Sequence, residues 1–375
     1  MIYASDLDRT LIYSPAALGV PENTPGLLPA ESDGGRTLSY ISAAALEALS
    51  GLPPEVVFIP VTTRTVAQYR RIELFRDLVI PEYAVTSNGG TILVNGAVDR
   101  EWQAGMEAKV KAGSASAAEV RTIVLEALRQ EWIASERWCD EFFFTFVVHR
   151  DLIPAETALA LSDRLYGLGW RVSLQGRKLY AVPAAVSKSE AVLHISSRLG
   201  RRVMVASGDS LLDRSLLDIA DCAIVPPHGE IYAQAAQRAN ADGASGAGGA
   251  VDAGSTRDAG GARGTGSAKD AASTMGTGGT GGARGTGSAK DAVCTMGAGG
   301  TGSAKDAAST TGAGGTGGAR DAASTTVAGG TGDAHPGGYR FTSRSGVFAA
   351  DEILSLVREF HERNRESAEA EAGAS

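Results

Sequence analysis

Residues 1–12 read MIYASDLDRTLI, with two aspartates, Asp6 and Asp8, placed directly after the apolar run of residues 2–5. A short and largely apolar run of this kind is typical of a buried β-strand. Two carboxylates spaced two residues apart at the end of such a strand repel each other. Their presence therefore indicates a functional site at which a cation compensates the repulsion.

Apolar segments alternate with helical patterns along much of the chain before residue 240. The predicted strands are residues 2–5, 55–61, 83–86, 202–207 and 222–225, and the predicted helices are residues 38–50, 65–76, 188–199 and 210–219. Wholly apolar strands that alternate with helices indicate an α/β protein with a parallel sheet covered on both faces. Such sheets bind their ligands at the carboxyl ends of the strands.

Residues 90–182 have a different pattern. Asn95-Gly96 predicts a hairpin turn, and residues 140–149 predict a long strand. Further helices are predicted at residues 115–133 and 154–167, and further strands at residues 170–175 and 178–183. This mixture indicates an α+β domain inserted into the parallel-sheet domain.

Composition excludes several classes of protein. The 375-residue chain has a net charge of −8, so we expect no nucleic-acid partner, because binding to phosphate backbones needs a basic surface. No apolar run reaches about 18 residues and no secretory signal is recognisable, so we expect a cytoplasmic protein that does not contact membranes. Cys139, Cys222 and Cys294 lie far apart and fit neither a disulfide framework nor a zinc site.

Residues 240–337 consist almost entirely of Gly, Ala, Ser, Thr and Asp, and RGTGSAKDA begins at Arg263 and again at Arg284. So few bulky side chains cannot offset a backbone entropy cost of about 1–2 kcal/mol per residue. We therefore predict a disordered repeat insertion, and no protein partner can be assigned to it. A last core strand and helix are predicted at residues 338–364, followed by a solvated tail at residues 365–375.

Side chains with reactive or metal-binding groups follow the predicted strands. They are Asp6 and Asp8 after the first strand, Thr62 and Thr63 after residues 55–61, Asp209 and Asp213 after residues 202–207, and Lys188 at the start of a helix. Because gathered carboxylates favour a hard cation with oxygen ligands, this set predicts bound Mg²⁺. A carboxylate can attack phosphorus, and a second acid can protonate the leaving group and then activate water.

These residues resemble the four motifs of the haloacid dehalogenase-like superfamily of phosphohydrolases. DLDRT resembles the first motif, PVTTR the second, VSKSEAV the third and SGDSLLD the fourth. The resemblance implies a Mg²⁺-dependent phosphatase in which Asp6 is the nucleophile and Asp8 the general acid and base. The implied metal ligands are Asp6, the backbone carbonyl of Asp8, Asp209 and Asp213, and the implied phosphate-binding residues are Thr62, with Thr63 as the alternative, and Lys188.

Two stretches on either side of the inserted domain indicate which branch of the superfamily the chain resembles. VTSNGG and LYAVPAAVSKSEAV look like signatures of the Cof-like and sucrose-phosphatase-like branch, which has a C2-type α+β cap between the second and third motifs. This branch mostly hydrolyses sugar phosphates and related small metabolites. Asn88 either contacts the substrate or supplies turn geometry, and the cap candidates for binding an anionic substrate are Arg150, Arg171, Arg177 and Lys178. Arg9 departs from the family, which usually has Gly there, so its side chain is expected to point away from the site or over it.

The expected organisation is a Rossmann-like core with an inserted cap. The boundaries are 1–89 and 183–239 for the core, 90–182 for the cap, 240–337 for the repeat insertion, 338–364 for the end of the core and 365–375 for the tail. The stretch from Leu11 to Thr37 is predicted to be a long loop that acts as a lid. Two alternative functions stay open: a phosphosugar mutase with the same core, and a non-catalytic phosphate-sensing scaffold that uses the repeat region.

Overall fold

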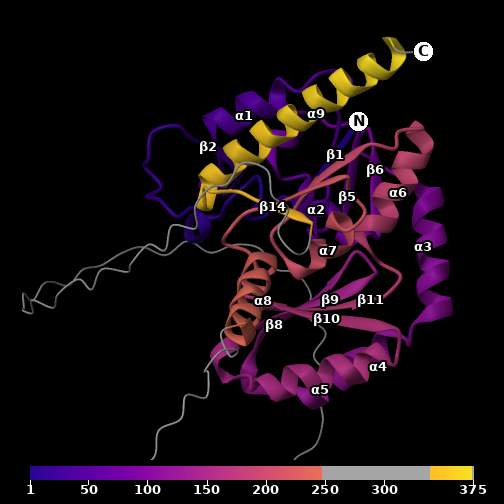
Figure 1. Ribbon diagram of the computed structural model, residues 1–375. Helices are drawn as coiled ribbons and strands as arrows, with labels where there is room; N and C mark the ends of the chain where they lie inside the picture. The colour runs from indigo at the N-terminus through magenta and orange to yellow at the C-terminus, as the bar shows by residue number, and fades with distance from the viewer. Residues whose placement is uncertain (247–337, 374–375) are drawn as a thin grey trace, which may run out of the picture. The chain divides into compact units, whose positions relative to one another are not determined.

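The structure, a computed structural model, describes residues 1–246 and 338–373 (Figure 1). The predicted repeat insertion at residues 240–337 therefore lies outside the described residues, except for residues 240–246, which continue helix α8 (Glu230–Gly246). The sequence of α8 is rich in alanine, the residue with the highest helix propensity. This propensity explains why the helix extends beyond the boundary that composition suggested.

A five-stranded parallel sheet forms the centre of the core. In spatial order its strands are β14 (Tyr339–Phe341), β13 (Cys222–Val225), β12 (Met204–Ser207), β1 (Ile2–Ser5) and β4 (Val57–Pro60). β1 lies between β12 and β4, and Ser5 at its end is in register with Ser207 and Pro60. The carboxyl ends of these three strands therefore meet at one edge. The predicted α/β fold with a parallel sheet is confirmed.

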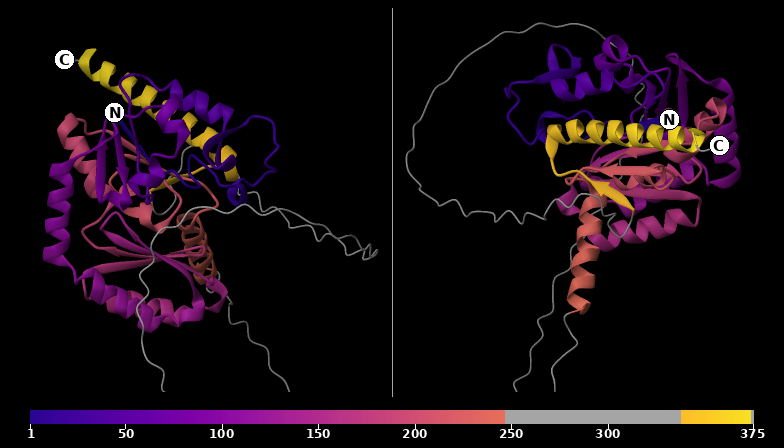
Figure 2. Two further views of the ribbon diagram at one scale, coloured as in Figure 1. Left: turned by 180° about the vertical axis from the view of Figure 1, so that it is seen from behind. Right: turned by 45° about the horizontal axis from the view of Figure 1, so that its top comes forward.

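Apolar side chains on the two faces of this sheet belong to two separate clusters. Tyr3 shares a cluster with Leu354 of α9 (Ala349–Gly373), whereas Ala4 shares the other with Val192 of α6 (Lys188–Leu199). Neighbouring residues of a strand point to opposite faces, so β1 contributes to both clusters. Helix α1 (Ala43–Ser50) packs against α9, drawn in yellow, and α7 (Arg214–Leu217) packs against α6 (Figures 1 and 2). The sheet is covered on both faces, as predicted.

A small antiparallel sheet follows β4 along the chain. It consists of β5 (Tyr83–Thr86), β6 (Thr91–Val94) and β7 (Ala97–Val98). Asn95 and Gly96 between β6 and β7 have φ angles of 49° and 77°, the left-handed conformation that tight hairpins require. The predicted hairpin turn is therefore confirmed.

The second large sheet is antiparallel, and its strand order is β10 (Trp170–Gln175), β11 (Lys178–Pro183), β9 (Phe143–Val148) and β8 (Ile133–Cys139). Helices α4 (Ala117–Ala127) and α5 (Ala155–Tyr166) share a third apolar cluster with it. Strand β8 and helix α3 (Arg100–Gly113) were not predicted. Residues 134–137 in the middle of β8 are exposed, and three of these four are polar, so the strand gives no continuous apolar signal. The boundaries of a cap at residues 90–182 stay a prediction.

Two expectations for the N-terminal region are wrong. Residues 11–37 are not one long loop, because β2 (Leu27–Asp33) and β3 (Arg36–Ser42) form an antiparallel hairpin. The helix expected at residues 38–50 begins only at Ala43, where the Ser42 hydroxyl accepts a hydrogen bond from the Ala45 amide at 3.0 Å. Pairing with β2 therefore makes residues 38–42 a strand, and Ser42 caps the helix.

Several helices differ in length from the prediction. Residues 65–76 contain only α2 (Val66–Tyr69) and the start of a π-helical turn at Leu74–Leu78. Short 3₁₀ turns lie at Pro15–Ala17, Ser87–Gly89, Gln130–Trp132, Arg150–Leu152, Leu211–Asp213 and Gly346–Phe348. Helix α9 continues through the expected tail to Gly373, supported by an ion pair between Arg365 and Glu369 on successive turns. None of the described helices is long and apolar enough to cross a membrane.

Gly89 brings the end of β5 against the start of α6. Its φ is 103°, and a Cβ atom at this position would lie 2.1 Å from the carbonyl oxygen of Ser187. The close approach requires glycine and places Lys188, the next residue after Ser187, beside the sheet edge.

We predict that Gly89→Ala lowers the free energy of unfolding by at least about 2 kcal/mol, because the methyl group strains a left-handed residue and clashes with the Ser187 backbone. Gly96→Ala is the matched control, since Gly96 has a φ of 77° but open space around its Cβ position. Urea denaturation of both variants measures the difference. Equal losses would contradict the importance of the close approach.

Candidate functional site

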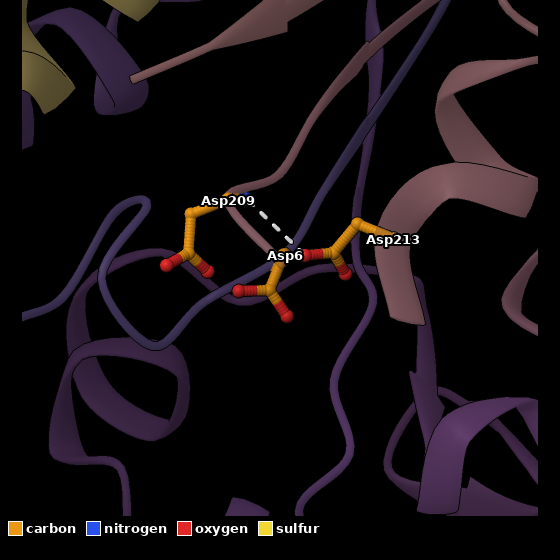
Figure 3. A group of neighbouring side chains, drawn as sticks. All are labelled: Asp6, Asp209 and Asp213. Carbon is orange, nitrogen blue, oxygen red and sulfur yellow. Dashed lines mark hydrogen bonds between the residues drawn. The ribbon is translucent and has the colours of Figure 1, made fainter. Parts of the chain in front are cut away.

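Three aspartates converge at the carboxyl edge of the parallel sheet (Figure 3). Asp6 directly follows β1, Asp209 follows β12, and Asp213 ends the next 3₁₀ turn. Oxygen atoms of the three carboxylates lie within 4.8 Å of one another, and all three residues are buried. The fold thus brings together acidic residues that are far apart in the sequence.

Lys188 lies between two of these carboxylates. As the first residue of α6 it is 1% exposed, and its Nζ donates to Oδ1 of Asp6 at 2.5 Å and to Oδ1 of Asp213. Burial lowers the pKa of an ammonium group, but the two aspartates outweigh this effect and raise the pKa of Lys188 above its usual value. Lys188 is therefore a permanently charged counter-ion inside the acidic cluster.

One ammonium group does not balance three buried carboxylates. Burial, and then the charge of Asp213, raise the pKa of Asp6 to about 7, although Lys188 opposes them. Burial and repulsion from Asp213 and Asp6 raise the pKa of Asp209 well above its usual value. Raised pKa values of this origin show that the cluster has a deficit of positive charge.

Asp213 organises the loop around Asp209. Its Oδ2 accepts hydrogen bonds from the backbone amides of Asp209 at 3.1 Å and Ser210 at 2.8 Å, and from the Ser210 hydroxyl at 2.7 Å. Gly208 makes this packing possible, because a Cβ atom there would lie 2.7 Å from Cγ of Asp213. Both oxygens of Asp213 therefore have partners inside the protein, which fits a residue that positions the others.

The donor set fits a divalent cation with oxygen ligands. Oδ2 of Asp6 has only a long contact, 3.4 Å, with the Thr10 hydroxyl, and Asp209 has only an ion pair of 3.3 Å between its Oδ2 and Nε of Arg9 among the described residues. Mg²⁺ binds through one or two carboxylates and completes its shell with water and phosphate oxygens. Asp6 and Asp209 are therefore the carboxylates with capacity for such an ion.

Asp8 does not belong to the acidic cluster. Arg64 binds its carboxylate through two hydrogen bonds, from Nε to Oδ2 at 2.8 Å and from Nη2 to Oδ1 at 2.7 Å. Burial opposes ionisation, but Arg64 outweighs it and holds the pKa of Asp8 below its usual value. Asp8 is thus kept ionised, in the state that accepts a proton.

A buried glutamate supports this arrangement and was missed in the sequence. Glu31 of β2 is 1% exposed and accepts hydrogen bonds from Nη1 of Arg64 at 2.6 Å and Nη2 of Arg71 at 3.0 Å. A buried carboxylate needs such partners, so Glu31 and Arg64 fix each other. The arginine of PVTTR was the available signal for this network, whereas nothing around Glu31 in the sequence indicates its burial.

The remaining predicted residues lie in different positions. Thr62 is buried, and its Oγ1 accepts a hydrogen bond from the Arg64 amide at 3.1 Å. Thr63 lines the cavity described below. Asn88 has a φ of 58°, and its Nδ2 donates to the carbonyl of Val186 at 3.3 Å, whereas its Oδ1 has no hydrogen-bond partner among the described residues. Asn88 therefore joins the end of β5 to the segment before α6 and does not line the cavity.

A cavity of about 330 Å³ lies between the acidic edge and the β10–β11 hairpin. Its lining includes Asp6, Asp8 and Asp209 from the core and Gln175, Arg177 and Lys178 from the hairpin. Of the four basic cap candidates, Arg177 and Lys178 line the cavity, whereas Arg150 and Arg171 do not. The arrangement can bind an anion of small-molecule size between cationic and acidic walls.

We predict that Lys188→Met lowers the free energy of unfolding at pH 8 by about 3–5 kcal/mol, because two buried carboxylates lose their counter-ion. Lys188 opposes the rise in the pKa of Asp6, so its loss raises that pKa further above the unfolded value. The folded protein then binds more protons than the unfolded chain, and its stability increases as the pH falls. The loss should accordingly be smaller at pH 5 than at pH 8 in denaturant titrations. Lys111→Met, at an exposed position of α3, is the control; a loss for Lys188→Met that does not vary with pH would contradict the assignment.

Many solved structures resemble this chain, and they include the following three. The sucrose-phosphatase from Synechocystis sp. PCC6803, in complex with sucrose and phosphate, is 16% identical, with 61% of this chain and 84% of that chain covered and a TM-score of 0.45. The protein 0175 of Thermoplasma acidophilum is 13% identical, with 62% of this chain and 88% of that chain covered and a TM-score of 0.41. The HAD subclass IIB sugar phosphatase BT4131 is 15% identical, with coverages of 63% and 90% and a TM-score of 0.39. No curated protein sequence matches the chain.

The sequence profile of one protein family, described as sucrose-6F-phosphate phosphohydrolase, matches residues 1–239. The matched segment contains the four motifs and the antiparallel β8–β11 sheet, whereas β14 and α9 lie beyond it. The chain therefore belongs to the sucrose-6F-phosphate phosphohydrolase family of the haloacid dehalogenase-like superfamily, and it is a phosphoric monoester hydrolase.

Proposed function

We propose that the protein is a Mg²⁺-dependent phosphatase that hydrolyses a small sugar phosphate through an aspartyl-phosphate on Asp6. The position of Asp6 carries this proposal. Nζ of Lys188 donates a hydrogen bond to Oδ1 of Asp6, and Asp209 lies beside Asp6. Asp6 also lines the cavity between the core and the β10–β11 hairpin. Membership of the sucrose-6F-phosphate phosphohydrolase family supports a sugar phosphate as the substrate class.

In the first half-reaction, a carboxylate oxygen of Asp6 attacks phosphorus while the bond from phosphorus to the sugar oxygen breaks. The leaving oxygen takes a proton from Asp8. Arg64 holds Asp8 ionised in the free protein, so Asp8 has to gain a proton when the substrate binds. The negative phosphoryl group favours this gain, because a nearby anion raises the pKa of a carboxyl group.

In the second half-reaction, Asp8 accepts a proton from a water molecule, which attacks the phosphorus of the aspartyl-phosphate. The bond between phosphorus and Asp6 breaks, inorganic phosphate leaves, and the Asp6 carboxylate is restored. The two hydrogen bonds from Arg64 favour Asp8 in its ionised form at the start of this step. One carboxyl group thus serves as acid and then as base.

Mg²⁺, when bound, supplies positive charge that stabilises the phosphoryl oxygens and relieves the repulsion between the carboxylates. Asp6, Asp209 and the backbone carbonyl of Asp8 would hold it, and Asp213 supports Asp209 through the loop hydrogen bonds. We therefore assign Asp213 the role of positioning Asp209, because both carboxylate oxygens of Asp213 already have protein partners.

Lys188 and a threonine hydroxyl bind the phosphoryl oxygens in this proposal. Thr63 is favoured for direct contact because it lines the cavity, whereas the Thr62 hydroxyl holds the backbone of Arg64. We further propose that residues 90–182 act as a cap domain on a core of residues 1–89, 183–239 and 338–364. Closure of such a cap excludes bulk water from the reacting groups.

We expect Asp6→Asn to lower kcat by at least about 1,000-fold, because the amide cannot form the acyl-phosphate. The measurement is release of inorganic phosphate from a panel of sugar phosphates with Mg²⁺ present. Asp33→Asn, at an exposed position of β2, is the control and should keep full activity. Full activity of Asp6→Asn would refute the proposed nucleophile, and a phosphorylated sugar product without free phosphate would indicate the mutase.

We predict that Arg177→Gln raises KM about three- to tenfold with little change in kcat, because Arg177 lines the cavity and pairs with no carboxylate among the described residues. Arg171→Gln removes the same charge from the same hairpin outside the cavity and is the matched control. Steady-state kinetics with the best substrate of the panel separates the two parameters. Equal KM values for both variants would exclude Arg177 from substrate binding.

A further inference from the structure

Arg9 occupies an unusual position directly after the catalytic aspartates. Its φ is 66°, in the left-handed region that side chains other than glycine rarely adopt. The backbone carbonyl of Arg9 is bound by Nε2 of His228 at 2.7 Å, and the Arg9 guanidinium in turn donates from Nη2 to the carbonyl of His228. Nδ1 of the same imidazole accepts from the Gly346 amide at 3.1 Å. The backbone of this loop is thus held independently of the charge on Arg9.

The charge of Arg9 is directed at a single carboxylate. Its Nε lies 3.3 Å from Oδ2 of Asp209, whose side chain is 7% exposed, whereas the side chain of Arg9 is 47% exposed. Asp209 receives no hydrogen bond to its carboxylate from any other described residue. Lys188, the other nearby cation, is already committed to Asp6 and Asp213. Arg9 is therefore the counter-ion of Asp209.

We propose that Arg9 is a built-in competitor of the divalent cation for the Asp209 carboxylate. The proposal rests on the Mg²⁺ site of the proposed function, in which Asp209 is a ligand. A hard cation and a guanidinium both need the oxygens of Asp209, and two positive charges at one carboxylate repel each other. Binding of the metal ion therefore requires the guanidinium to leave Asp209.

Release of Arg9 from Asp209 is sterically simple. The side chain is half-exposed and lines the cavity, so it can move into that space. The His228 carbonyl remains available to its Nη2 as a second acceptor. Arg9 thus neutralises Asp209 in the metal-free protein, and it weakens metal binding by the free energy of the ion pair that has to be broken. Arg9 thereby sets the metal concentration at which the protein becomes loaded.

The test measures metal affinity and does not use turnover. Isothermal titration with Mg²⁺, repeated with Mn²⁺, compares the wild-type protein with Arg9→Gln, which keeps a long polar side chain but loses the charge. We expect a Kd about two- to fivefold lower for Arg9→Gln, the range for a partly exposed ion pair. Arg9→Lys, which keeps the charge, should stay close to the wild type.

Thermal unfolding gives a second readout that a purely structural role would not produce. Without metal, Arg9→Gln should melt at a lower temperature than the wild type, because Asp209 loses its counter-ion. Saturating Mg²⁺ should then raise the melting temperature of Arg9→Gln by more than it raises that of the wild type. A loss of stability that is the same with and without Mg²⁺ would overturn the proposal.

Asp209→Asn distinguishes failure of this inference from failure of the proposed function. If Asp209→Asn binds Mg²⁺ as tightly as the wild type, Asp209 is not a metal ligand, and the metal site of the proposed function is wrong. If Asp209→Asn binds Mg²⁺ weakly but Arg9→Gln binds no more tightly than the wild type, the metal site stands and Arg9 is not a competitor.

Discussion

The charge balance around Lys188 is the constraint on which the rest of the site depends. One buried ammonium group lies against Asp6 and Asp213, and the third carboxylate of the cluster, Asp209, has only half-exposed Arg9 as counter-ion. Burying ions in this way costs several kcal/mol per group, so the arrangement contributes little to stability. Such groups are instead typical of sites where chemistry needs charge. In the proposed function, a bound divalent cation would supply the positive charge that this cluster lacks.

Two separate networks give the neighbouring aspartates opposite properties. Burial and repulsion raise the pKa of Asp6, whereas the Arg64 guanidinium lowers the pKa of Asp8. Glu31 of the β2–β3 hairpin fixes Arg64 by accepting a hydrogen bond from its Nη1. Environments that shift the pKa values of two carboxyl groups apart permit different roles in one reaction. The spacing of DLD in the sequence places the two groups, and the surrounding fold distinguishes them.

The sequence predicted the elements that carry strong local signals. The apolar strands, the Asn95-Gly96 turn and the helix starting at Lys188 agree with the structure, and three of the four predicted aspartates, Asp6, Asp209 and Asp213, do meet at one edge. What it missed depends on tertiary contacts. The exposed middle of β8 interrupts its apolar pattern, and the β2–β3 pairing overrides the helical pattern of residues 38–42. The partners of Asp8 and Asp209 could not be predicted either, because they come from segments that only the folded chain brings together.

The most direct test of the central claim is the location of a divalent cation in a crystal grown with Mn²⁺, using the anomalous scattering of the metal. We predict one ion at the edge of the parallel sheet, bound by carboxylate oxygens of Asp6 and Asp209, with Lys188 still paired to Asp213. An ion bound at another place, or an acidic edge that stays free of metal at saturating Mn²⁺, would contradict it.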